Sequence, residues 1–216
     1  MREEFRGDLL ETGRLLVSMG ESARSAMHNA TLALMNADQA RAETVIARDA
    51  EIDANYRTIE ELVQHLLARQ APVARDLRLV VSALHVAADL ERMGDLAAHV
   101  AKTALRRHPA MAVPPEAAGI IASMADVADR IAGKITLVLS GQDAVRAAEL
   151  ERDDDAMDAL HRQLFELLLS PGWSHGVEAG IDCALLGRFY ERYADHAVNA
   201  GNHVVFMVTG EPAQPR

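Results

Sequence analysis

Apolar residues along this chain recur mostly every three or four positions, the spacing that places them on one face of an α-helix. In the first such stretch, residues 3–35, the apolar positions include Leu9, Leu16, Met19 and Ala23. Short apolar runs such as residues 79–81 fall inside longer stretches of helical period, and no separate strand-like clusters occur in the sequence. The pattern therefore predicts an all-α protein.

Capping and helix-breaking residues divide this pattern into six segments. Asp38 and Asp143 are good N-caps, and Pro72 suits the first turn of a helix. Three prolines between residues 108 and 115 mark the main linker. The expected helices cover about residues 3–35, 38–68, 72–107, 115–140, 143–170 and 177–209, and the tail 211–216 is expected to fray.

The second half of the chain repeats the acidic motifs of the first half in the same order. A D-x-x-x-D motif on the second segment recurs about 105 positions later, and an E-R-x-x-D motif on the third segment recurs about 100 positions later. The repeated acids are Asp49, Asp53, Glu91 and Asp95 in the first half, and Asp154, Asp158, Glu191 and Asp195 in the second. Three segments repeated in register predict two tandem three-helix bundles, residues 1–108 and 109–216, stacked into one elongated six-helix domain.

Composition narrows the class of function. The formal net charge of −10 disfavours nucleic acid as a partner, because binding the phosphate backbone needs a basic surface. The single cysteine, Cys183, excludes an internal disulfide and is compatible with a reducing compartment. The chain has no apolar signal core at its N-terminus and no apolar run long enough to span a membrane. We therefore expect a cytoplasmic protein that meets membranes only through its partners.

The repeated acids are the candidate chemistry. Two residues four positions apart share a helix face, so each motif directs two carboxylates to one place, where they repel each other. A bound cation would relieve the repulsion, and oxygen ligands from two helices suit Mg, Mn or Fe ions and, less well, Zn. His99 and Asn199 lie one turn beyond the motifs and are possible additional ligands. The alternative is a salt-bridge network with arginines of neighbouring helices, for which Arg48, Arg75 and Arg78 are the candidates; Arg92 and Arg192 are expected to point away.

Enzyme signatures are missing from the sequence. It contains no G-x-S-x-G, no P-loop and no dinucleotide-binding glycine pattern. Di-iron bundle enzymes carry Glu-x-x-His on two helices, whereas here Gly94 and Ala194 stand three positions after the motif glutamates. We therefore expect a protein that is not an enzyme.

Taken together, these stretches resemble the PhoU family of phosphate-signalling proteins, including its actinobacterial members. The resemblance rests on residues 48–53, 72–79, 89–95 and 188–199 and covers nearly the whole chain. It implies a tandem of three-helix bundles, with iron or zinc clusters or single cations on the acidic motifs of some members. The sequence departs from a strict repeat at His99, which stands opposite Asn199, and at Ala194, which stands opposite Gly94.

The resemblance also implies a role. Family members look like negative regulators of the phosphate regulon that link the ABC-type phosphate transporter, through its ATPase subunit, to a phosphate-sensing histidine kinase. The leading hypothesis is thus a non-enzymatic adaptor, which an elongated bundle pair could provide as a homodimer. The alternatives are a carboxylate-cluster metal-binding protein or metal-dependent enzyme, and a purely structural helical protein.

Overall fold

The computed structural model describes residues 2–141 and 143–211, so residues 212–216 of the tail that was expected to fray lie outside the described part. Helices occupy almost all of these residues, and no strand occurs among them. The helices are α1 (Arg2–Asn36), α2 (Gln39–Gln70), α3 (Ala74–Arg107), α4 (Pro115–Gly141), α5 (Ala144–Ala148), α6 (Leu150–Leu168) and α7 (Gly176–Thr209). The prediction of an all-α fold is confirmed.

The predicted N-caps explain where α2 and α5 begin. Asp38 accepts a hydrogen bond from the backbone N–H of Arg41 at the start of α2, and Asp143 accepts one from the N–H of Arg146 at the start of α5. Each carboxylate satisfies an N–H that has no partner within its helix. Residues 108–114 form the linker between α3 and α4, where three prolines stand in or next to the loop.

One predicted helix, residues 143–170, is wrong as a continuous element, because the chain turns at Glu149 and separates α5 from α6. The N–H of Glu149 bonds to the carbonyl of Arg146, a tighter turn than an α-helix makes. Leu150, directly after the turn, is fully buried, and its side chain packs so closely on Gly201 that a Cβ there would lie 2.6 Å from its Cδ1. The break thus coincides with a packing contact on α7, and the local sequence does not predict the break.

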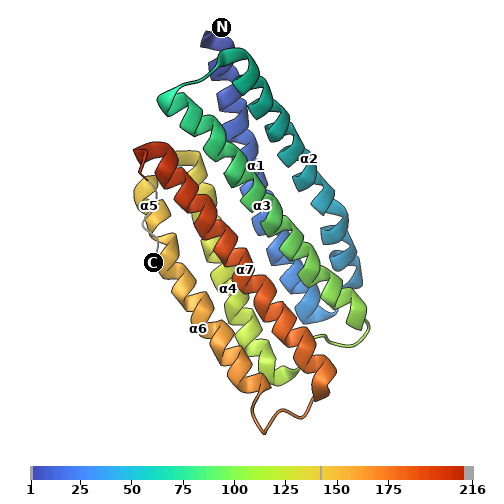
Figure 1. Cartoon of the computed structure of the whole chain (residues 1–216). Coiled ribbons are helices and arrows are strands. Elements are labelled where there is room, and N and C mark those ends of the chain that lie inside the picture. The colour runs from blue at the N-terminus through green and yellow to red at the C-terminus, as the bar shows by residue number, and fades with distance from the viewer. Residues whose placement is uncertain (1, 142, 212–216) are drawn as a thin grey trace.

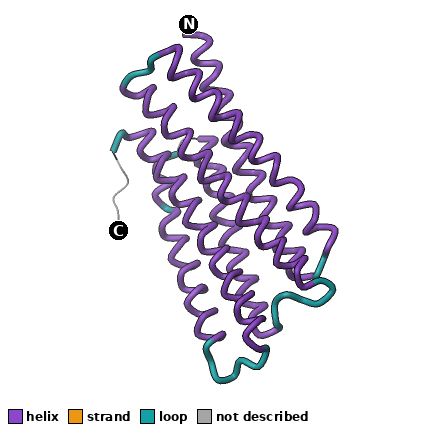
Figure 2. The backbone as a smooth tube through the Cα atoms, turned by 45° about the vertical axis from the view of Figure 1, so that its right-hand side comes forward, coloured by secondary structure: helices purple, strands orange, loops and turns teal. Residues whose placement is uncertain are grey.

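The six longer helices form two three-helix bundles that lie side by side (Figure 1), and the short α5 packs on α7. α1 and α2 pack on α3, while α4 and α6 pack on α7. α3 and α7 run next to each other in opposite directions, and α1 also contacts α4, so the two bundles share a broad seam. The longer loops lie at the ends of this elongated molecule, and short turns also separate α4, α5 and α6 (Figure 2).

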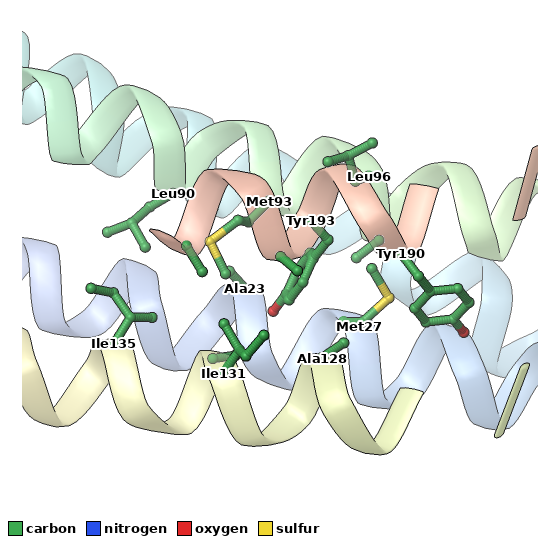
Figure 3. Packing of buried hydrophobic residues seen from close by; sticks show 14 of the residues in the cluster. Ala23, Met27, Leu90, Met93, Leu96, Ala128, Ile131, Ile135, Tyr190 and Tyr193 are labelled. Atoms are coloured by element: carbon green, nitrogen blue, oxygen red, sulfur yellow. The ribbon is translucent and has the colours of Figure 1, made fainter. Parts of the chain in front are cut away.

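A single hydrophobic core runs through both bundles. At the seam, Tyr190 and Tyr193 of α7 are fully buried against methionine and alanine side chains of α1, α3 and α4 (Figure 3). The hydroxyl of Tyr190 shares a 2.7 Å hydrogen bond with Oγ1 of Thr31. Small residues such as Ala23 and Ala128 let the helices approach closely enough to enclose these rings. The core thus fixes α7 against α1, α3 and α4, and with it the position of the acidic motifs.

Candidate functional site

The first acidic cluster consists of Glu91 and Asp95 on α3 and Asp49 and Asp53 on α2. Gly94 brings the two helices together, because a Cβ at this position would lie 2.8 Å from Cδ1 of Ile52 and 3.1 Å from Oδ1 of Asp49. The structure therefore assembles the four carboxylates of the first repeat that the sequence singles out.

Burial and mutual repulsion both disfavour the charged form of these acids. Burial raises the pKa of Asp49 above its usual range, and the negative charges of Asp95 and Asp53 raise it further. The pKa of Glu91 is raised in the same way, by burial first and then by Asp95. The cluster thus holds its negative charge at a cost in free energy, which a positive charge can relieve.

Arg92 supplies part of that positive charge, contrary to the expectation that it points away. Its Nη1 lies 2.8 Å from Oδ2 of Asp95 and its Nε lies 3.4 Å from Oε2 of Glu91. Although the Cα–Cβ bond of Arg92 points away from the acidic face of α3, its long, flexible side chain bends back to reach that face. Arg48, the candidate for a bond between helices, instead pairs with Glu51 on its own helix at 3.3 Å.

His99 extends the first cluster toward the second bundle. Its Nδ1 lies 2.7 Å from the backbone carbonyl oxygen of Asp95, one turn earlier, and its ring contacts that of Phe189 on α7 with centroids 5.3 Å apart. With Nδ1 donating to the carbonyl, Nε2 is the nitrogen left to accept a proton or bind an ion. Lys102 is close enough to Asp49 to oppose the rise in its pKa.

The second acidic cluster consists of Glu191 and Asp195 on α7 and Asp158 on α6. Burial raises the pKa of Glu191, and Asp195 raises it further. Burial also raises the pKa of Asp195, with Asp158 adding to the effect and Arg188 opposing it. Arg188 donates to both carboxylate oxygens of Glu191. Burial thus raises carboxyl pKa values in this cluster as in the first, but its arginine lies three positions before the glutamate, whereas Arg92 directly follows Glu91.

The other residues proposed for the second site lie around it. Asp154 is half-buried one turn before Asp158 on α6, and Asn199 is exposed one turn after Asp195. The neighbour of Asp154, Asp153, joins α6 to α4 through Lys134, whose Nζ lies 2.6 Å from Oδ2. His161 and His196 both act on the pKa values of the cluster acids, which places two histidines beside this cluster. The two acidic clusters therefore differ in their surroundings.

The donor set suits hard cations, but its present arrangement does not match a closed metal site. Among residues 2–141 and 143–211, no three His, Cys, Asp or Glu side chains form a group that could hold a metal ion as they stand. Arginine occupies carboxylate oxygens in both clusters, through Arg92 in the first and Arg188 in the second. Cation binding at these acids stays a prediction.

A further polar group, separate from the two acidic clusters, lies between α3 and α7 and was not predicted. Oδ1 of Asp89 lies 2.9 Å from Nδ1 of His196, and its Oδ2 lies 3.9 Å from Nε2 of His203. The ring of His203 stacks on that of His85, with centroids 4.8 Å apart. His85 and Asp89 are one turn apart in the sequence, but the histidines of α7 join them only when the bundles pack. No sequence signal indicates this pairing.

Nearer the linker, Asp182 of α7 is almost fully buried and binds two arginines of α3. Nη2 of Arg106 lies 3.0 Å from Oδ1, and Nη2 of Arg107 lies 2.5 Å from Oδ2. Arg107 also reaches Glu178 at 2.8 Å. These ion pairs join the end of α3 to the start of α7 and so stabilise the seam between the bundles.

None of the described helices combines the length and the apolar character needed to cross a bilayer. Fold and site together define a class of protein: a tandem of helical bundles, each carrying a cluster of carboxylates where its second and third helices meet.

Comparison with known proteins identifies the family. Residues 16–104 and 121–204 match the PhoU domain, and the chain belongs to the PhoU family. It is 46% identical over 210 residues to "Phosphate-specific transport system accessory protein PhoU homolog 2" of Mycobacterium tuberculosis, covering 97% of this chain and 99% of the relative. It is also 46% identical to the PhoU homolog 1 of Mycobacterium leprae, over 97% of this chain and 95% of the relative.

Solved structures agree with this assignment. The crystal structure of PhoU from Pseudomonas aeruginosa superimposes with a TM-score of 0.87 at 26% identity, over 96% of this chain and 100% of that one. The phosphate transport system regulatory protein PhoU from Streptococcus pneumoniae gives a TM-score of 0.86 at 25% identity, over 98% and 100% of the chains. The resemblance read from the sequence motifs is confirmed.

Proposed function

We propose that this protein is a negative regulator of the phosphate regulon, acting in the cytoplasm as a non-enzymatic adaptor, and that it works as a homodimer. It would link the ABC-type phosphate transporter, through its ATPase subunit, to a phosphate-sensing histidine kinase. The names of its relatives support the transporter connection, since they are accessory proteins of phosphate-specific transport. The kinase connection rests on the family resemblance of the motifs.

The structural observation that carries the adaptor role is a repeated, exposed apolar surface. On α7, the side chains of Val177, Ile181 and Leu185 follow one another at one-turn intervals and are 80%, 55% and 40% exposed. At the equivalent positions of α3, Leu77 and Val81 are 40% and 37% exposed. Apolar side chains left in water at corresponding places of both repeats are suited to burial against a partner. We propose that the α7 stripe, residues 177–185, binds the transporter ATPase subunit.

Binding assays with this ATPase subunit test the adaptor role. We expect the purified chain to bind the subunit, and Ile181→Glu/Leu185→Glu to weaken binding at least tenfold, because the charges would have to be desolvated in the interface. Leu10→Glu is the matched control, since Leu10 is 65% exposed on α1, away from the stripe, and its replacement is expected to leave binding unchanged. Wild-type affinity in the double variant would rule out the α7 stripe.

Deletion of the gene tests regulation separately. In phosphate-rich medium we expect phosphate-scavenging genes to lose repression, and the wild-type gene to restore it. Normal repression in the deletion strain would rule out the regulatory role, whatever the binding assays show.

Cation binding by the acidic clusters is the second candidate. The observation that favours it is that burial and neighbouring carboxylates raise the pKa values of acids in both clusters. Fe, Zn, Mn or Mg ions would relieve this repulsion, provided that Arg92 and Arg188 move off the carboxylates. Asp49, whose raised pKa reflects burial more than any neighbouring group, is the most informative acid to change.

Without metal, Asp49→Asn is expected to raise the free energy of unfolding by about 0.5 kcal/mol at pH 7. The folded pKa of Asp49 lies above its unfolded pKa, so the charged side chain lowers the stability of the wild type at pH values above the folded pKa. The advantage of the variant should therefore shrink as pH falls through the raised pKa, and vanish below the ordinary carboxyl pKa of about 4. Urea unfolding at several pH values measures this, with exposed Glu61→Gln on the same helix as the control.

Added Mn, Fe, Zn or Mg ions should reverse the order of stability. A cation held by the cluster raises the midpoint of thermal unfolding of the wild type by mass action, and should raise that of Asp49→Asn much less. Equal shifts in the two proteins for every metal would remove Asp49 from the cation site.

A further inference from the structure

A broad hollow of about 540 Å³ opens between α1, α4 and α5, and none of the acids of the two clusters lines it. Four cationic side chains line it, together with Thr136 and one acid, Glu21. The cations are Arg24, Arg130, Lys134 and Arg146. The chain as a whole has 32 acidic and 22 basic residues, so this lining reverses its overall charge balance.

Two of these cations, Arg24 and Lys134, are held by carboxylates that do not line the hollow. Asp129 accepts hydrogen bonds from Nε and Nη2 of Arg24 at 2.8 and 2.7 Å, while Asp153 and Glu149 hold Nζ of Lys134 at 2.6 and 3.3 Å. None of these three carboxylates lines the hollow. They therefore orient the cations without filling the space in front of them.

Gly133 shapes the floor beneath Arg24. A Cβ at position 133 would lie 3.1 Å from both the central carbon and Nη1 of the Arg24 guanidinium, so the group rests directly on the α4 backbone. Nη1 is the nitrogen that Asp129 does not engage. Its N–H donors remain available to a ligand in the hollow.

The guanidinium groups of Arg130 and Arg146 contact carboxylates only at longer distances. Nε of Arg130 lies 4.0 Å from Asp153, and Nε of Arg146 lies 3.8 Å from Asp143, both beyond hydrogen-bonding distance. Their side chains are 53% and 46% exposed. Each guanidinium can therefore turn its paired N–H groups toward an anion that enters the hollow.

This arrangement is typical of oxyanion recognition. Guanidinium groups bind phosphate oxygens in pairs, and the ammonium of Lys134 adds a further positive charge. Among the described residues, no aromatic ring and no side-chain amide lines the hollow to recognise a nucleobase. Four cations surround more space than a single charge requires, which favours a compact ligand with several negative charges.

We propose that this hollow binds a multiply charged inorganic oxyanion of the phosphate class, for which pyrophosphate is the probe. The site involves three helices from both bundles, so its occupation would link α1 to α4 and α5. The proposal is independent of the adaptor role, because it concerns a different surface and a different measurement.

Isothermal titration calorimetry with pyrophosphate, inorganic phosphate, sulfate and ATP tests this proposal. We expect pyrophosphate to bind more tightly than phosphate or sulfate, and its affinity to fall as salt is raised, because exposed charges are screened. Arg130→Gln/Arg146→Gln should weaken pyrophosphate binding at least tenfold. Arg57→Gln/Arg69→Gln is the matched control: it removes the same charge from exposed positions of α2 and should change binding less than twofold.

Three results would overturn the proposal. These are no heat of binding with pyrophosphate, an equal loss in the two double variants, which would mean a non-specific charge effect, and tighter binding of ATP, which would mean a nucleotide site. Thermal unfolding of each variant checks that the fold is intact. Should Arg130→Gln/Arg146→Gln unfold, the single Arg146→Gln variant keeps the test open, since Nε of Arg146 lies 3.8 Å from Asp143, beyond hydrogen-bonding distance.

Discussion

Tyr193→Ala is expected to lower the free energy of unfolding by about 3–5 kcal/mol, the range for removing a large aromatic side chain from a core. The ring of Tyr193 is fully buried where α7 meets α1, α3 and α4, and Ala23, Met93 and Ile131 lie around it (Figure 3). The cavity left by truncation cannot close easily, because it lies where both bundles contribute rigid helices. Urea unfolding followed by circular dichroism measures the loss.

Two phenylalanine variants separate the ring of Tyr193 from its hydroxyl. The Oη atom of Tyr193 is buried without a hydrogen-bond partner among the described residues, whereas that of Tyr190 bonds to Thr31. Tyr193→Phe is therefore expected to be neutral or stabilising, because it removes a polar atom that has nothing to bond to. Tyr190→Phe should cost about 1 kcal/mol through the lost hydrogen bond. The reverse order of the two variants would contradict this account of the core.

Breaking the ion pairs of Asp182 is expected to have the next largest effect. Asp182→Ala should lower the free energy of unfolding by about 2 kcal/mol, which is less than for a fully buried pair because Arg106 is 55% exposed and can return to water. Arg106→Gln/Arg107→Gln should destabilise more than Asp182→Ala, since it leaves a carboxylate buried at 6% exposure without a countercharge. The same unfolding assay compares them.

Glu178→Gln is the matched control for this network. Glu178 pairs with Arg107 but is 82% exposed, and an exposed ion pair adds little to stability. We expect its replacement to leave the unfolding midpoint nearly unchanged. A loss as large as that of Asp182→Ala would mean that the arginines, and not the buried carboxylate, determine the energetics of the seam.

The helical pattern was predictable because it depends on local chemistry. Apolar spacing sets which face each helix buries, and short-range groups such as Asp38 and Asp143 set where helices begin. The acidic clusters were also visible, since an i,i+4 pair lies on one face of any helix, and the repeat showed that the pairs occur twice. Sequence spacing could not show that Arg92 folds back on its neighbours, because that depends on a flexible side chain responding to the local field.

Other features arise only when distant segments meet. The Asp89–His196 pair joins residues 107 positions apart, and the cationic hollow combines side chains of α1, α4 and α5. The break at Glu149 accompanies the burial of Leu150 against Gly201 on another helix. In each case the responsible neighbour is remote in sequence, so no local pattern carries the information.

By itself, the sequence determined the class of fold, the two repeats and which carboxylates share a helix face, because these follow from periodicities within one helix. Tertiary structure decided which charges neutralise those carboxylates, how the bundles are joined, and where cations gather on a chain of net charge −10. The physical reason is that burial and electrostatic pairing depend on distances between helices. Those distances are set by packing. Tyr193 packs where the two repeats meet, and Gly94 lets the neighbouring helices α2 and α3 approach each other.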